Sequence, residues 1–124
     1  MRVLLDTHLL LWALAAPAKL PAAARTRIEA AEVYVSAASI WEISIKSALG
    51  KLEADPQEVL TAIAPAGFSL LPITGEHAAK VRELPPLHKD PFDRMLVAQA
   101  QLEGLTIVTR DSQFQAYGVP VLAC

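Results

Sequence analysis

Short apolar runs alternate with longer segments of helical periodicity along the whole chain. The apolar runs are rich in Val, Ile and Leu and end at turn-forming or acidic residues, which is the pattern of buried β-strands. Five such runs predict strands, at residues 2–5, 33–36, 68–73, 105–109 and 119–123. Because these runs are nearly continuous in apolar residues, we expect a parallel sheet that is covered on both faces.

The segments between these strands have the end signals of helices. Asp-Pro pairs at 55–56 and 90–91 combine an N-cap with proline at the first helical position, and Gly50 and Gly104 follow helical segments as C-caps. Helices are predicted at residues 7–15, 22–32, 39–50, 76–84, 90–104 and 111–118, with a further one beginning at 55–56.

The alternation of strands and helices defines the expected architecture. In a chain of this kind, right-handed crossovers place helices on both faces of the sheet. We therefore predict a three-layer α/β/α sandwich with a central, mostly parallel sheet. A length of 124 residues suffices for one hydrophobic core, and no repeat or linker divides the chain, so residues 1–124 are expected to form a single domain.

The composition of the chain excludes several classes of protein and of binding site. Apolar residues make up 53% of the chain, which excludes disorder, and a net charge of −2 excludes a globally basic surface for nucleic acid. The single cysteine, Cys124, excludes a disulfide framework and a thiolate zinc site, and it fits a reducing cytoplasm. The longest uncharged stretch, 59–75, contains prolines and glycines, so we expect no membrane span, and we expect no export signal.

Four acidic residues lie where apolar runs meet helical segments: Asp6, Glu42, Asp93 and Asp111. Ligand crevices in open α/β sheets lie beyond the carboxyl ends of the strands, so these acids can converge at one edge. Clustered carboxylates need a neutralising cation, and magnesium and manganese are hard cations that take oxygen ligands. We therefore predict a divalent-metal site in which these four acids are the metal-binding and catalytic residues.

Each acid alone also has a structural explanation. Asp93 can form a capping box with Asp90 as the N-cap. Asp111 can cap a short helix, and Glu42 can pair with the lysine four residues on. Asp6 has the fewest such partners. The joint placement of the four favours a shared site over four separate structural roles.

Polar and aromatic neighbours of the acids give further candidates. Three of them adjoin the acids in the sequence and are candidate substrate-binding residues: Thr7, Arg94 and Arg110. The histidines lack the spacing of a zinc site; His8 can contact substrate or pack against a helix, and His88 is assigned to the loop before Asp90. Trp12 and Trp41 lie on apolar helix faces, so we expect them in the core rather than stacked on bases.

Four segments around the acids form a specific set of motifs: LLDTHLLLW, SAASIWEISIK, HKDPFDRMLVAQA and IVTRDSQF. In this order they resemble the PIN domain, in particular the VapC toxins of bacterial toxin–antitoxin pairs, and the resemblance spans nearly the whole chain. It implies a Mg²⁺- or Mn²⁺-dependent ribonuclease in which a metal-activated water attacks an RNA phosphodiester. Asp6 and Asp93 would be the principal metal ligands, with Glu42 and Asp111 completing the pocket. It also implies a homodimer and a small VapB-like antitoxin.

Other functions compete with this interpretation. A receiver-like phospho-acceptor domain has a similar length and fold, but it needs paired acids after the first strand and a lysine after a late strand, and this chain lacks both. A haloacid-dehalogenase-like phosphatase needs a D-x-D motif, in which His8 replaces the second acid. A catalytically inactive PIN module that only binds a partner is a further alternative, against which the intact acidic set argues.

Overall fold

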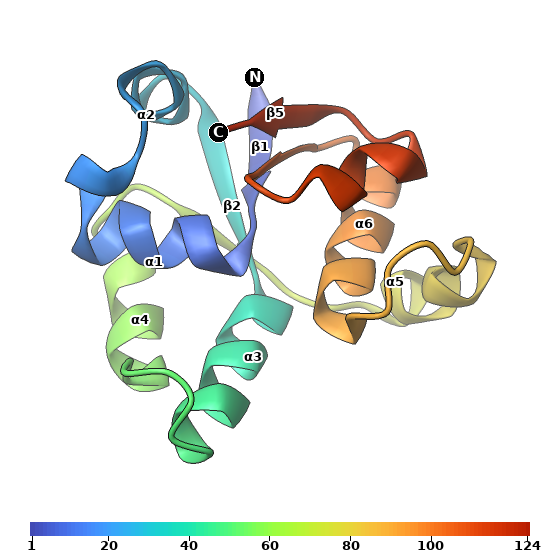
Figure 1. The fold of residues 1–124 in the computed structure, drawn as a ribbon, viewed down its shortest axis with the longest axis horizontal. Helices are drawn as coiled ribbons and strands as arrows, with labels where there is room; N and C mark the ends of the chain where they lie inside the picture. Colours follow the sequence, from blue (N-terminus) through green and yellow to red (C-terminus); the bar gives the residue numbers. More distant parts are fainter.

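The computed structural model describes all 124 residues, and its centre is a five-stranded sheet (Figure 1). The strands are β1 (Arg2–Leu5), β2 (Glu32–Ser36), β3 (Ser69–Leu71), β4 (Thr106–Thr109) and β5 (Val121–Ala123). All neighbouring strands pair in parallel, in the order β3-β2-β1-β4-β5. β1 is therefore central, and the carboxyl ends of all five strands face the same edge of the sheet.

Helices cover both faces of this sheet (Figure 1). The α-helices are α1 (Thr7–Ala15), α2 (Ala22–Glu29), α3 (Ala37–Ala48), α4 (Pro56–Ile63), α5 (Gly75–Lys80) and α6 (Pro91–Glu103), and 3-10 helices span η1 (Pro17–Lys19), η2 (Val81–Glu83) and η3 (Ser112–Tyr117). Val3 and Leu5 of β1 join the core beneath α1–α4, whereas Leu4 points to the core beneath α6. The predicted three-layer sandwich is thus confirmed. None of the helices combines the length and the apolar character needed to cross a membrane.

The predicted element order matches the structure, with differences at element ends. The helix predicted at 22–32 stops at Glu29, because Glu32 already belongs to β2. The strands predicted at 68–73 and 119–123 are shorter in the structure, where Pro72 and Pro120 flank β3 and β5 and have no N–H to donate to a sheet. The strand predicted at 105–109 begins one residue later. The last predicted helix is a 3-10 helix.

The two tryptophans do not share the buried position predicted for both. Trp12 is half-buried and packs against the core beneath α1, but Trp41 is 59% exposed. The prediction for Trp41 is wrong because the rest of the chain covers only part of its side chain. Its aromatic contact is with Phe92 of α6, where the ring centroids lie 5.2 Å apart.

Candidate active site

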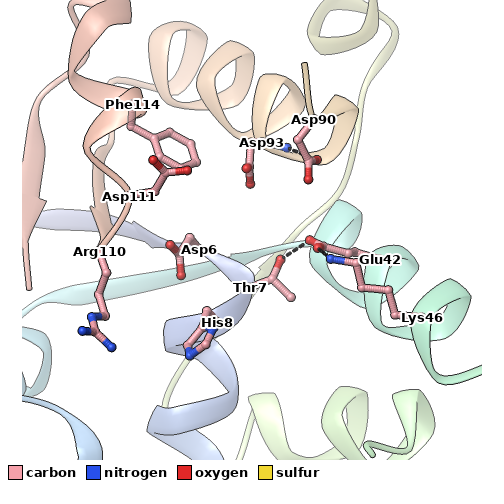
Figure 2. A pocket seen from close by; sticks show the side chains of 10 residues that line it. All are labelled: Asp6, Thr7, His8, Glu42, Lys46, Asp90, Asp93, Arg110, Asp111 and Phe114. Carbon is pink, nitrogen blue, oxygen red and sulfur yellow. Dashed lines mark hydrogen bonds and ion pairs between the residues drawn. The ribbon is translucent and has the colours of Figure 1, made fainter. Parts of the chain in front are cut away.

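A cavity of about 490 Å³ opens at the carboxyl ends of β1 and β4 (Figure 2). Its walls come from these strand ends, from the start of α1, from the middle of α3 and from the first turns of α6 and η3. The lining residues are Asp6, Thr7, His8, Glu42, Lys46, Asp90, Asp93, Arg110, Asp111 and Phe114. The structure therefore brings all four predicted acids, from both ends of the chain, into one cavity.

Asp6 lies between β1 and α1 and is held through both carboxylate oxygens. Its Oδ1 accepts a hydrogen bond from the Leu9 N–H (2.8 Å) and so caps α1, and its Oδ2 accepts one from the Thr109 hydroxyl at the end of β4. Asp6 thus has more hydrogen-bond partners than its sequence context predicts. Burial raises the pKa of Asp6 above its ordinary value, and the two hydrogen bonds partly offset this effect. A buried carboxylate of this kind is stabilised by a nearby cation.

Glu42 reaches the cavity from α3, and two neighbours fix its orientation. The Thr7 hydroxyl donates to Glu42 Oε1 (2.7 Å), and Lys46 Nζ donates to Oε2 (2.5 Å). The ion pair considered from the sequence is therefore present, but it does not remove Glu42 from the cavity. Thr7, a predicted substrate-binding residue, lines the cavity and also positions this acid.

Asp93 lies in the first turn of α6, which Asp90 caps as predicted. Asp90 Oδ1 accepts hydrogen bonds from the N–H groups of Phe92 (2.8 Å) and Asp93 (3.2 Å). Burial and the neighbouring Asp90 carboxylate raise the pKa of Asp93 to about 7, against a lowering effect of His88. In the absence of a cation, Asp93 is therefore partly protonated near neutral pH.

His88 was not predicted as a site residue, yet it joins two of the acids. Its Nε2 lies 2.9 Å from Asp93 Oδ2 and 3.1 Å from Asp111 Oδ2. Its Nδ1 accepts the Asp90 N–H (3.3 Å), which leaves the proton of the neutral ring on Nε2, facing both carboxylates. Because that N–H donates to His88, the capping box considered for Asp93 does not form. The only sequence signal for His88 was its place in the HKDPFD motif.

The remaining predicted residues point in different directions. Asp111 Oδ1 accepts the Gln113 N–H (2.9 Å) and caps η3, while its other oxygen faces the cavity. Arg110 also lines the cavity, but Arg94 does not. The Arg94 guanidinium donates to four acceptors, the carbonyl oxygens of Val81, Leu84 and Pro85 and the hydroxyl of Tyr117. The structure thus places Arg94 differently from the prediction: its guanidinium holds the 81–85 segment against α6 and does not line the cavity.

The donor atoms of the cavity fit a hard divalent cation. Five carboxylates line it: Asp6, Glu42, Asp90, Asp93 and Asp111. One oxygen each of Asp93 and Asp111 and one ring nitrogen of His88 lie within 4.8 Å of one another, and Asp6 faces the same space (Figure 2). Carboxylate oxygens are the ligands that suit magnesium or manganese, whereas the Nε2–H of His88 faces two of these carboxylates as a hydrogen-bond donor. A cation here would also relieve the burial and repulsion that raise the pKa of Asp93.

Comparison with known proteins identifies the family. The sequence model of the PIN domain matches residues 3–120. The chain belongs to the PIN domain family. No curated protein matches the sequence closely enough to add to this.

Solved structures share the fold of this PIN domain. A chain of VapBC2 from Rickettsia felis, bound to a DNA fragment from the promoter, superposes with a TM-score of 0.74 at 16% identity, over 99% of this chain and 98% of that chain. A chain of DNA-bound VapBC from Salmonella typhimurium superposes with a TM-score of 0.70 at 18% identity, over 99% of this chain and 98% of that chain. A chain of FitAcB from Neisseria gonorrhoeae superposes with a TM-score of 0.67 at 24% identity, over 98% of this chain and 96% of that chain. At these identities the likeness shows a common fold.

Proposed function

We propose that this PIN domain is a Mg²⁺- or Mn²⁺-dependent ribonuclease and the toxin component of a toxin–antitoxin pair. The observation behind the proposal is the convergence of four acids from both ends of the chain into one cavity of a PIN fold. Asp6 and Asp93 are the proposed principal metal ligands, and Glu42 and Asp111 complete the site. The shared fold with chains of VapBC and FitAB complexes supports the toxin assignment.

The side chains around the acids prepare them for this reaction. When bound, the ion supplies a water that is more easily deprotonated and positive charge for the phosphoryl oxygens of the phosphodiester. The protein keeps the oxygen donors in place: Thr109 holds Asp6 from β4, and Thr7 holds Glu42 across the α1–α3 contact. His88 donates its Nε2–H between the other two acids. Fixed donors of this kind need little rearrangement when the reaction begins.

RNA must be recognised by local contacts. A net charge of −2 provides no long-range attraction for a polyanion, so residues at the cavity have to contact the phosphates. Thr7 and Arg110 line the cavity and are the proposed substrate contacts. Membership of the PIN family excludes the receiver-like and phosphatase-like alternatives. No observation favours an inactive module, because every acid is present with its supporting hydrogen bonds.

Two protein partners are proposed. Structures with the same fold are described as VapBC and FitAB complexes, which supports a VapB-like antitoxin. A second copy of this chain is the other partner. A groove of about 440 Å³ between α3, α4 and β3, here called the α3–α4 groove, is lined by the exposed side chains of Trp41, Leu60 and Leu70. Because β3 is an edge strand and these apolar residues lie together, the groove supports a homodimer contact.

Growth of a bacterial host that expresses the chain tests the function. The wild type should arrest growth, and Asp93→Asn should not, because the amide removes a charged ligand at the cavity. Asp55→Asn is the matched control, since Asp55 caps α4 outside the cavity and asparagine is an equally good N-cap. Equal growth with the wild type and Asp93→Asn, at equal protein levels, would contradict the proposal.

A further inference from the structure

Arg110 is a cation at the acidic cavity that is not paired with any carboxylate. The other cation that lines the cavity, Lys46, is paired with Glu42. No ion pair of the structure includes Arg110, although Asp111 is its neighbour in the sequence. Arg94 provides the contrast, because its guanidinium is saturated by carbonyl and hydroxyl oxygens. Arg110 therefore keeps its fork of N–H donors free for a ligand.

The Arg110 guanidinium is nevertheless held in place, by the ring of Trp12. Its Cζ lies 5.0 Å from the ring centroid, which is a cation–π contact. His8 packs edge-on against the same indole, with ring centroids 4.7 Å apart and planes at 82°. Trp12 is half-buried and packs against the core. Two side chains that line the cavity thus share one rigid aromatic support.

The position of this pair relative to the acids indicates what it contacts. Arg110 and His8 lie on the side of Asp6 away from Asp93 (Figure 2). The phosphate to be cleaved belongs at the proposed metal ligands, so a strand that continues past Asp6 brings a neighbouring phosphate to Arg110. A guanidinium matches the geometry of a phosphate through two parallel hydrogen bonds. A fixed cation also offsets the repulsion between an acid-lined cavity and the rest of the polyanion.

We propose that Arg110 and His8, supported by Trp12, form a subsite for the RNA phosphate adjacent to the cleaved one. The inference rests on the proposed ribonuclease function and adds a substrate requirement to it. RNA with a second phosphate on the Arg110 side is the preferred substrate, and a dinucleotide, which lacks that phosphate, is a poor one. Trp12 is a positioning residue, because it acts through Arg110.

Neutral linkages in a short RNA test the subsite. A single methylphosphonate is placed in turn at each linkage that flanks the cleaved bond, and kcat/KM is measured. At one flanking position the neutral linkage should lower kcat/KM of the wild type by roughly 10- to 100-fold, the range of a lost charge-assisted hydrogen bond. Arg110→Ala should lose a similar factor on the unmodified RNA and lose nothing further on the modified one. If the neutral linkage lowers kcat/KM of Arg110→Ala by as much as it lowers that of the wild type, the subsite is rejected.

Two variants separate positioning from folding. Trp12→Phe keeps an aromatic face, so the methylphosphonate should still lower kcat/KM by most of the wild-type factor. Trp12→Leu should make this loss of kcat/KM smaller. The two variants should have the same melting temperature. Arg27→Ala, an exposed arginine of α2 that does not line the cavity, should retain the full loss of kcat/KM. A smaller loss in Arg27→Ala would show that any lost positive charge has this effect, and the subsite would be rejected.

Affinity measured with Ca²⁺ in place of Mg²⁺ distinguishes the subsite from the ribonuclease function. With the methylphosphonate placed in turn at every linkage of the RNA, the wild type should bind the unmodified RNA more tightly than the RNA neutralised at one position, and Arg110→Ala should bind these two RNAs equally. If this affinity pattern holds but no RNA is cleaved with Mg²⁺ or Mn²⁺, the ribonuclease function fails and the phosphate subsite stands. If RNA is cleaved, but Arg110→Ala leaves the differences in kcat/KM and in affinity between the unmodified and the neutralised RNA unchanged, only the subsite is rejected.

Discussion

Asp6 serves the fold and the cavity with the same carboxylate. One oxygen caps α1 and the other accepts the Thr109 hydroxyl, so the side chain has a structural role even without a cation. At the same time burial raises its pKa, which means that its charge is unfavourable in the metal-free protein. Two substitutions at this position separate the two roles.

Asp6→Asn should preserve the fold and lose the response to metal. Asparagine is as good an N-cap as aspartate, and it removes a buried negative charge, so the metal-free melting temperature should stay equal or rise. Asp6→Ala, the control, should lose the cap and about 1 kcal/mol of unfolding free energy. Thermal unfolding with and without millimolar Mn²⁺ checks this: the wild type should gain stability and Asp6→Asn should gain less. An equal gain in both would contradict the ligand role.

The raised pKa of Asp93 predicts how the stability of the metal-free protein depends on pH. Its ordinary value is 3.8, and in the folded protein it is about 7. Between these values the folded state binds a proton that the unfolded state does not, so the free energy of unfolding should fall as pH rises from about 4 to about 7. Urea unfolding in EDTA between pH 5.5 and 8 measures this slope. Asp93→Asn should flatten it, and an unchanged slope in that variant would refute the assignment.

The acids could be predicted from the sequence, whereas His88 could not. Asp6 and Asp111 follow strands, and Asp93 lies in the first turn of a helix. Glu42 lies in the second turn of α3, the helix after β2. Parallel strands bring such positions to one edge. His88 acts through contacts with Asp93, five positions later, and with Asp111 in another element. Arg94 failed as a prediction for a related reason, because being next to Asp93 in the sequence does not determine which way a side chain points on a helix.

Helix α6 begins and ends at residues that the sequence marks clearly. Asp90 caps its first turn, Pro91 occupies the first position, and Gly104 ends it in the left-handed conformation, with φ at 67°. These signals place Asp93 in the first turn, where it faces the cavity. The position of a proposed metal ligand is thus determined by local helix chemistry.

Gly104→Ala should destabilise the protein by about 1 kcal/mol, because an alanine side chain disfavours the left-handed backbone. No atom lies within 4 Å of the added Cβ, so the effect is conformational alone. Gly75→Ala is the matched control: the site is equally open, it begins α5, and its φ is not positive. Gly75→Ala should be neutral or stabilising. Equal losses by chemical denaturation would contradict this account of the helix end.

Two elements differ from their sequence patterns for physical reasons. The segment after Asp111 has helical spacing, but it is short and ends at Gly118, and it forms a 3-10 helix. Trp41 lies on an apolar stripe of α3 that continues beyond what the chain itself can cover, so the side chain is exposed. A periodic pattern shows that a face is apolar and does not show which molecule covers it.

At the scale of the whole molecule, strand order is what unites the site. Pairing of β1 with β4 places Asp6 beside the end of β4, and Asp111 follows that strand two residues after Thr109. The sequence predicted parallel strands with helices on both faces. It could not predict which strands are neighbours, because local patterns do not report pairings between distant segments.

The α3–α4 groove predicts a dimer. Light scattering should give twice the mass of the 13.3 kDa chain. Trp41→Glu, or Leu70→Glu on the edge strand, should give a monomer, because either places a charge in the apolar contact. Leu102→Glu is the control, since Leu102 is similarly exposed on α6 away from the groove. A monomeric wild type, or a dimer that both groove variants retain, would place the contact elsewhere or exclude it.

The central claim is that the converged acids hydrolyse RNA with a divalent ion, and cleavage by the purified protein tests it most directly. Defined RNA is incubated with the wild type and with Asp6→Asn, prepared in parallel, in Mg²⁺, Mn²⁺ or EDTA, and the cut positions are mapped. The account predicts specific cuts by the wild type with either ion, none in EDTA, and none with Asp6→Asn. Cuts that persist in EDTA, or that Asp6→Asn retains in full, would contradict it.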